Sequence, residues 1–289
     1  MNINWYPGHM VKAENDIKKD LKIIDIVVEV LDARIPKSSK NPNIDKFSDG
    51  KLKIIILNKY DLADKENVKK WTNSYNELGI PVICMDSSNN QDIKSLVQKI
   101  NELGKKFYDN KYKDRKININ PIYKVLIVGI PNVGKSTIIN KIAGRNSANM
   151  GNKPGVTKQK QWIKVGSNVE LLDTPGLLWP KLDTKQIGVN LALTGNINQD
   201  ILDSEELSIE GIKLLINNQN YKNMLFERYK LSDKDIIKVE DEPIEYSILK
   251  AIGKKRGCIL PGGIVDTLKS AKAFLDDFKN GKIGKISLE

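Results

Sequence analysis

Up to about residue 180, the chain alternates between short apolar runs and longer segments with helical periodicity. Four runs are rich in β-branched residues, and each is typical of a strand buried in a parallel sheet: 23–31, 53–57, 81–85 and 122–128. Apolar stripes with helical spacing follow three of these runs: 64–78, 92–107 and 135–143. Strands and helices in alternation predict an α/β fold with a mostly parallel sheet.

The rest of the pattern predicts a hairpin and then helices alone. Two further strands, 161–165 and 169–172, flank a Gly-Ser-Asn turn. After Pro180 the chain offers helical segments without comparable strand candidates: 204–229, 243–253 and 262–279. We therefore expect two domains, an α/β domain at 1–185 and a helical domain at 186–289.

Residues 129–136, Gly-Ile-Pro-Asn-Val-Gly-Lys-Ser, follow a predicted strand and open a predicted helix. Glycines let backbone N–H groups turn inward around phosphates. Lys135 is then expected to reach the terminal phosphates of a nucleotide, and Ser136 to offer its hydroxyl to Mg²⁺. The strand-loop-helix context favours a nucleoside triphosphate site over a chance glycine-rich turn.

Residues 58–61, Asn-Lys-Tyr-Asp, end another predicted strand and predict a guanine reader. The Asp61 carboxylate can accept both hydrogen bonds from the N1 and N2 edge of guanine, which adenine cannot offer. Asn58 can bridge the base loop and the phosphate loop, and the Lys59 stem can lie over the ring. Ser87 and Ser88 follow the next strand and are expected to close the base pocket with backbone N–H groups.

Residues 173–176, Asp-Thr-Pro-Gly, close the last predicted strand. Asp173 is expected to hold Mg²⁺ through water, and the Gly176 N–H to meet the γ-phosphate. Thr157 lies between this motif and the phosphate loop and is the candidate sensor of Mg²⁺ and γ-phosphate. The predicted GTP-binding residues are Asn58, Lys59, Asp61, Ser87, Ser88, Asn132, Val133, Gly134, Lys135, Ser136, Thr137, Thr157 and Gly176, and the predicted Mg²⁺-binding residues are Ser136, Thr157 and Asp173.

These motifs stand in a rotated order, because the base reader precedes the phosphate loop, whereas ordinary GTPases carry them the other way round. A rotated order predicts a circularly permuted P-loop GTPase domain that binds GTP and GDP. We expect the helical domain to follow the GTPase domain directly.

The formal net charge of +11 suggests a polyanionic partner. Residues 121–185 carry 10 basic and 3 acidic side chains, and the helical tail ends on a basic stretch that includes Lys254, Lys255 and Arg256. The sequence contains neither a signal peptide pattern nor an apolar run of about 20 residues. These features predict a cytoplasmic protein without a membrane partner, which we expect to be a monomer.

The chain resembles the permuted ribosome-biogenesis GTPases of the RbgA/YlqF type over nearly its whole length. Beyond the motifs above, the resemblance is carried by residues 5–10, Trp-Tyr-Pro-Gly-His-Met, and 31–34, Leu-Asp-Ala-Arg. It implies a protein that binds and hydrolyses GTP and acts in late maturation of the large ribosomal subunit. It also implies that the helical domain binds RNA. We further hypothesise that the GTPase activity is slow alone and is stimulated by the ribosomal particle.

Two other functions remain open at this point. A GTP-dependent regulatory switch would instead have a non-ribosomal protein or membrane-surface partner, and its GTPase activity would not respond to ribosomal particles. A scaffold without hydrolysis is suggested by Leu177, which stands where many GTPases place a water-orienting glutamine.

Asn132 resembles the position at which potassium-stimulated GTPases hold K⁺ beside the phosphates, so K⁺ is a candidate second cation. Arg34, next to Asp32, is a candidate internal arginine finger, although local pairing and RNA contact are the alternatives we favour.

Since a leucine cannot orient water, another group has to, and His9 is the chain's only histidine. Imidazole accepts a hydrogen bond from water and has a pKa near neutrality. The resemblance favours His9 as the catalytic residue, brought into the site by the ribosomal partner, over an exposed histidine beside Trp5 and Tyr6.

We therefore expect His9→Ala to lower ribosome-stimulated GTP turnover by about 100-fold, the usual contribution of such a group, while GTP affinity stays unchanged. Steady-state phosphate release with and without large subunits measures the first quantity, and nucleotide titration the second. Unchanged stimulated turnover would exclude this role for His9.

Overall fold

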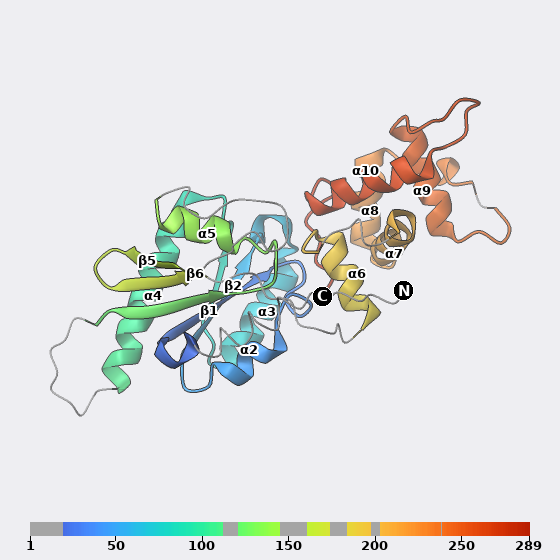
Figure 1. The fold of residues 1–289 in the computed structure, drawn as a ribbon. Coiled ribbons are helices and arrows are strands. Elements are labelled where there is room, and N and C mark those ends of the chain that lie inside the picture. The colour runs from blue at the N-terminus through green and yellow to red at the C-terminus, as the bar shows by residue number, and fades with distance from the viewer. Residues whose placement is uncertain (1–19, 112–120, 145–160, 174–183, 198–202, 238) are drawn as a thin grey trace. The chain divides into compact units, whose positions relative to one another are not determined.

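The computed structural model describes residues 20–111, 121–144, 161–173, 184–197, 203–237 and 239–289. The chain forms two compact units, Met1–Asp183 together with Glu289, and Thr184–Leu288. The observed boundary lies between residues 183 and 184, two residues before the predicted boundary between 185 and 186. The first unit contains the sheet, and the second contains helices (Figure 1).

The sheet has six strands in the order β3-β2-β1-β4-β6-β5. All neighbours are parallel except the hairpin pair β5 and β6, as the sequence predicts. The strands are β1 (Ile26–Asp32), β2 (Leu52–Asn58), β3 (Val82–Met85), β4 (Tyr123–Val128), β5 (Gln161–Val165) and β6 (Val169–Asp173).

Strands β1 and β2 each end one residue later than their apolar runs predict. Asp32 is the last residue of β1, Asn58 is the last residue of β2, and the two are paired in the parallel register. The start of β1 is also later than predicted, because Leu21–Ile23 forms a 3-10 turn. Two polar side chains are thus placed next to each other at the carboxyl edge of the sheet.

Helices cover both faces of the sheet. They are α2 (Pro42–Phe47), α3 (Lys65–Glu77), α4 (Asn90–Lys111) and α5 (Lys135–Ile142), with a short 3-10 turn, η2 (Tyr60–Leu62), after β2. Asp64 caps α3, since its carboxylate accepts hydrogen bonds from the N–H groups of Glu66 and Asn67. Helix α2 was not predicted, because six residues carry too little periodicity to detect.

Alternate residues of the buried strands pack on opposite helices. On one face, Val27 and Leu126 pack with Ile44 of α2, and Leu57 packs with Val68 of α3. On the other face, α4 lies against β1 and β4 so closely that a methyl group on Gly104 would approach Ile26 and Tyr123 to 3.2 and 3.1 Å. The sheet is therefore buried on both sides, as near-continuous apolar strands require.

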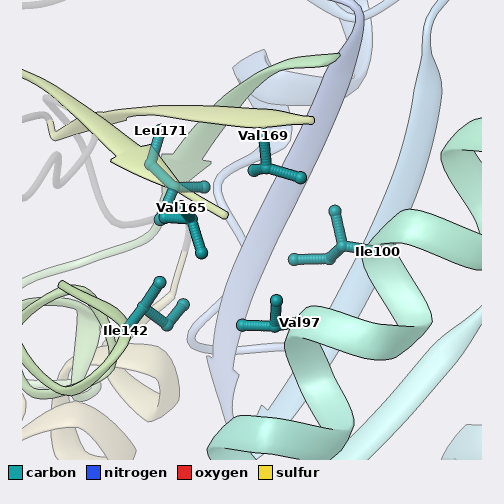
Figure 2. A pocket seen from close by; sticks show the side chains of 6 residues that line it. All are labelled: Val97, Ile100, Ile142, Val165, Val169 and Leu171. Atoms are coloured by element: carbon teal, nitrogen blue, oxygen red, sulfur yellow. The ribbon is translucent and has the colours of Figure 1, made fainter. Parts of the chain in front are cut away.

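A small hollow lies between α4, α5 and the β5-β6 hairpin (Figure 2). It has about 160 Å³ of empty space, part of it open solvent. Its lining is aliphatic throughout: Val97, Ile100, Ile142, Val165, Val169 and Leu171. A ligand site needs a few polar groups to orient its ligand, so this hollow is a packing gap and not a candidate site.

A buried ion pair crosses from β1 to β2. Glu29 is fully buried, lies 2.9 Å from the ammonium of Lys53 and accepts a hydrogen bond from the Asn41 N–H at 3.1 Å. Burial raises the pKa of Glu29 above its ordinary value, although Lys53 opposes that shift. Lys53 also pairs with Asp45 of α2, whose carboxylate lies 2.6 Å from Lys40. The network connects the sheet to α2, away from the carboxyl ends of the strands.

The second unit is an assembly of short helices: α6 (Lys185–Leu193), α7 (Ser204–Ile216), α8 (Gln219–Tyr229), η4 (Asp233–Asp235), α9 (Ile244–Lys255) and α10 (Thr267–Lys279). The single helix predicted at 204–229 is wrong, because Asn218 leaves the helical conformation and caps α8. The start predicted at 262 is also wrong. Gly262 and Gly263 adopt positive φ in a loop, and α10 begins only at Thr267.

Helix packing in this unit depends on small residues and one buried carboxylate. A methyl group on Gly211 of α7 would lie 2.8 Å from Leu193 and 3.0 Å from Phe274, so α7 and α10 approach closely. Asp277 of α10 is fully buried and accepts hydrogen bonds from Arg228 at 2.9 and 3.1 Å. Within the described ranges, every helix is too short or too polar to span a bilayer.

Candidate nucleotide-binding site

The candidate site lies at the edge of the sheet where the parallel strands end. Strand β1 pairs with β2 on one side and with β4 on the other, so the chain order reverses between β1 and β4. Ligands of open α/β sheets bind outside the carboxyl ends of the strands at such a reversal. The loops after β1, β2, β3 and β4 all meet there.

The phosphate loop after β4 is shaped by residues with positive φ. Gly129 (φ 154°), Asn132 (φ 58°) and Gly134 (φ 104°) adopt conformations that most side chains avoid. A methyl group on Gly129 would lie 2.5 Å from the carbonyl oxygen of Val30, so the loop approaches β1 too closely for any other residue. The loop then opens α5, whose N-terminal N–H groups and dipole favour an anion.

Lys135 begins α5 and is buried. Its ammonium donates a hydrogen bond to the carbonyl oxygen of Ile130 at 2.8 Å, and therefore lies over the loop that precedes it. This ammonium is the group that the sequence predicts to bind the terminal phosphates. Ser136 and Thr137 are half-buried in the first turn of α5, next to Lys135.

Asn58 joins three loops, as its predicted bridging role requires. Its side-chain amide donates hydrogen bonds to the carbonyl oxygen of Val133 at 2.6 Å and to the hydroxyl of Ser87 at 3.1 Å. Its amide oxygen accepts a hydrogen bond from the Ser87 N–H at 2.9 Å. A methyl group on Gly134 would lie 2.2 Å from Nδ2 of Asn58, so the contact also requires glycine at that position.

The next two predicted base-reading residues, Lys59 and Asp61, follow Asn58 in a tight turn. Lys59 has a left-handed backbone (φ 59°, ψ 33°), and its ammonium lies 2.9 Å from the carboxylate of Asp32. Asp61 is exposed in the turn η2, at the carboxyl edge of β2. The left-handed residue turns the chain so that residues 59–61 stay beside the sheet edge and do not extend away from it.

The serines after β3 are placed at this edge, but their N–H groups make contacts that the sequence does not reveal. The Ser87 N–H donates to Asn58, and the Ser88 N–H donates to the Asp86 carboxylate at 2.7 Å. We expected both N–H groups to face the base. In the structure they instead order the loop, and the Ser87 hydroxyl is the group that accepts from Asn58.

The candidate Mg²⁺ ligands are placed in part. The register pairs Asp173 with Ile127, so the end of β6 lies beside the strand that enters the phosphate loop. Among the described residues, no three His, Cys, Asp or Glu side chains form a metal cluster. Mg²⁺ in nucleotide sites is often bound by one or two protein oxygens together with phosphate oxygens, so it needs no such cluster. The Ser136 hydroxyl could supply one of these protein oxygens. Thr157, Gly176, Leu177 and His9 lie outside the described residues, as does the side chain of Asp173.

Arg34 pairs locally and is not available as an arginine finger. It is 2% exposed and donates hydrogen bonds from Nε and Nη2 to the two carboxylate oxygens of Asp32, at 2.9 and 2.8 Å. The sequence shows the Asp-Ala-Arg stretch at the end of β1, but sequence reasoning assigned Asp32 no role at the site. The available signal was a carboxylate at the end of a buried strand, two residues before an arginine.

A parallel sheet whose base-reading strand precedes its phosphate-loop strand defines a circularly permuted P-loop GTPase unit. The family described as 50S ribosome-binding GTPase matches residues 124–249. That match begins at β4, so Asn58 at the end of β2 and Ser87 after β3 lie upstream of it, as a permuted order requires.

Relatives match the whole chain. Ribosome biogenesis GTPase A of Bacillus licheniformis is 42% identical over 290 residues, which span 100% of this chain and 98% of that protein. The protein of the same name from Thermotoga maritima is 32% identical, over 99% of this chain and 94% of its own length. A structure of GDP-bound YlqF is 26% identical with a TM-score of 0.68, and covers 95% of this chain and 98% of its own. The chain belongs to the ribosome biogenesis GTPase A family.

Proposed function

We propose that this GTPase binds GTP at the carboxyl edge of its sheet, hydrolyses it, and acts in late maturation of the large ribosomal subunit. The observation that carries the nucleotide site is the set of Asn58 hydrogen bonds to Val133 and Ser87. They hold the base loop against the phosphate loop, so that one nucleotide can contact both loops.

Within the site, each group has a chemical task. Backbone N–H groups of residues 132–137 and the Lys135 ammonium bind the phosphates. Asp61 accepts from the guanine edge, and the stem of Lys59 lies along the ring. Ser136, Thr157 and, through water, Asp173 would hold Mg²⁺, which would supply charge neutralisation at the transferred phosphoryl group.

The hydrolytic water needs an orienting group, and our proposal keeps His9 in that role. The Leu177 side chain offers water no hydrogen bond, so intrinsic hydrolysis is expected to be slow. If the ribosomal particle brings His9 into the site, fast hydrolysis would occur only after the protein has docked on the particle. We also propose that the protein works in the cytoplasm as a monomer without a membrane partner.

The helical unit supplies a surface suited to RNA. Lys254, Lys255 and Arg256 are exposed at the end of α9, and residues 246–265 contain no acidic side chain. The following loop exposes Leu260 and Ile264, the latter by 66%. Lysines and arginines bind phosphates, and apolar side chains such as leucine and isoleucine can insert between base steps. Lys255 also pairs with Asp235 at 2.8 Å, so Lys254 and Arg256 are the better probes of this surface.

Asp61→Asn should change the base preference from guanine to xanthine. An asparagine amide accepts from N1–H and donates to the 2-oxo group of xanthine, but it cannot accept both guanine hydrogen bonds. We expect GTP affinity to fall by roughly 10- to 100-fold and XTP to bind better than GTP, as measured by competition titration. Asp64→Asn is the matched control, because asparagine caps α3 equally well. GTP preference retained in Asp61→Asn would refute the base-reading role.

Lys254→Glu and Arg256→Glu should each weaken co-sedimentation with purified large subunits and reduce the slope of log affinity against log salt by about one. Lys213→Glu, an exposed charge reversal on α7, is the control and should leave both quantities near wild type. Wild-type protein that neither co-sediments nor gains GTPase activity with large subunits would favour a regulatory switch with a non-ribosomal partner.

GTP turnover should be faster in potassium than in sodium at equal ionic strength, if the Asn132 amide oxygen helps to hold a monovalent cation. Asn132→Gly removes the amide but tolerates the positive φ of this position, so it should abolish the difference. Equal wild-type turnover in the two salts would remove K⁺ from the mechanism.

A further inference from the structure

A buried carboxylate at the end of β1 contacts two cations from different loops. Asp32 is fully buried, and its Oδ1 accepts hydrogen bonds from the Arg34 backbone N–H at 3.1 Å and from Arg34 Nε at 2.9 Å. Its Oδ2 accepts from Arg34 Nη2 at 2.8 Å and lies 2.9 Å from Nζ of Lys59. Both oxygens therefore have defined partners, and one of these partners belongs to the base-reading loop.

Arg34 fixes where this carboxylate points. A guanidinium that binds both oxygens of a carboxylate specifies its plane as well as its position. The Arg34 side chain is 3% exposed, so solvent does not compete strongly for it. The backbone at this point is also held, since the Ala33 N–H donates to the carbonyl oxygen of Asn58 at 2.8 Å. Asp32 thus presents a stationary anion beside Lys59.

That anion restrains Lys59 at the far end of its side chain. The backbone of Lys59 is set by its left-handed conformation, and its ammonium is set by Asp32, so the four-carbon stem between them has little freedom. The side chain as a whole is still 22% exposed. A restrained and partly exposed apolar stem, between Asn58 and Asp61, is a ready contact surface for a flat ring.

We propose that Asp32 is a positioning residue for guanine nucleotides, which acts by holding the Lys59 stem in its binding conformation before the base arrives. Arg34 serves the same end by orienting Asp32. This inference rests on the proposed role of residues 58–61 in binding the base. It differs from a purely structural role, in which Asp32 would only compensate the buried Arg34.

Three variants in the full-length protein separate these roles: Asp32→Asn, Lys59→Met and the double variant. Methionine keeps an unbranched stem of similar length but has no ammonium for Asp32 to hold. Loss of restraint on one long side chain should weaken GDP and GTP binding by about tenfold in each single variant. Because both changes break the same contact, the double variant should also lose about tenfold and not about 100-fold.

The readout is the dissociation constant for ribose-labelled fluorescent GDP, together with its dissociation rate and the thermal midpoint of each variant. Asp45→Asn is the matched control, because it removes a carboxylate that pairs with Lys40 and Lys53 away from the strand ends. It should change nucleotide affinity by less than about twofold. If Asp32→Asn does not fold, Arg34→Lys replaces it, since lysine keeps the charge but cannot orient both oxygens.

Wild-type affinity in Asp32→Asn, or an equal loss of affinity in the wild-type and Lys59→Met backgrounds, would overturn the positioning role. That result would leave the proposed base site intact, provided that Lys59→Met and Asp61→Asn still weaken GTP binding. If those two variants bind GTP normally, the base site itself is wrongly assigned.

Discussion

The contact on which the site depends is made by one buried amide. Asn58 lies 29 residues before Ser87 and 75 residues before Val133 along the chain, yet it hydrogen-bonds to both. A side chain that is 1% exposed cannot leave these donors and acceptors unsatisfied without a cost of about 1–3 kcal/mol for each group. Gly134 makes the approach possible, because any side chain there would overlap the amide. The base loop, the phosphate loop and the loop after β3 are therefore positioned together.

The parallel sheet explains why these loops lie together even though the order of the motifs along the chain is rotated. Parallel strands place all their carboxyl ends at one edge, whatever the order in which the chain visits them. What the permutation changes is the connection. Strands β1, β2 and β3 come first, and α4 connects them to β4. Beyond β6, ten residues of chain lead to Thr184, the first residue of the helical unit. The Asp-Thr-Pro-Gly motif at 173–176, for which we propose a contact with the γ-phosphate, is thus the motif nearest in sequence to the helices.

Much of this molecule could be read from its residues. The strands, the hairpin, the Asp64 cap and the loop after β4 all follow from local patterns, because β-branched runs, a capping carboxylate and spaced glycines act over a few residues. The predicted helix bounds were wrong where local patterns were incomplete. Asn218 interrupts a helix that periodicity alone continues to 229, and paired glycines delay α10 until Thr267. Helix α2, six residues long, is held by packing of Ile44 more than by any repeat.

The sequence alone determined the class of chemistry, since the residue types in the base and phosphate motifs are dictated by guanine, phosphate and the turns that cradle them. Tertiary structure decided which of those residues support one another. Asp32 belongs to no nucleotide motif, but the register places it beside Asn58 and within reach of Lys59. The N–H groups of Ser87 and Ser88 are bound to Asn58 and Asp86, which no local pattern reveals. Contacts between distant loops depend on how strands are paired, and pairing is a property of the folded sheet.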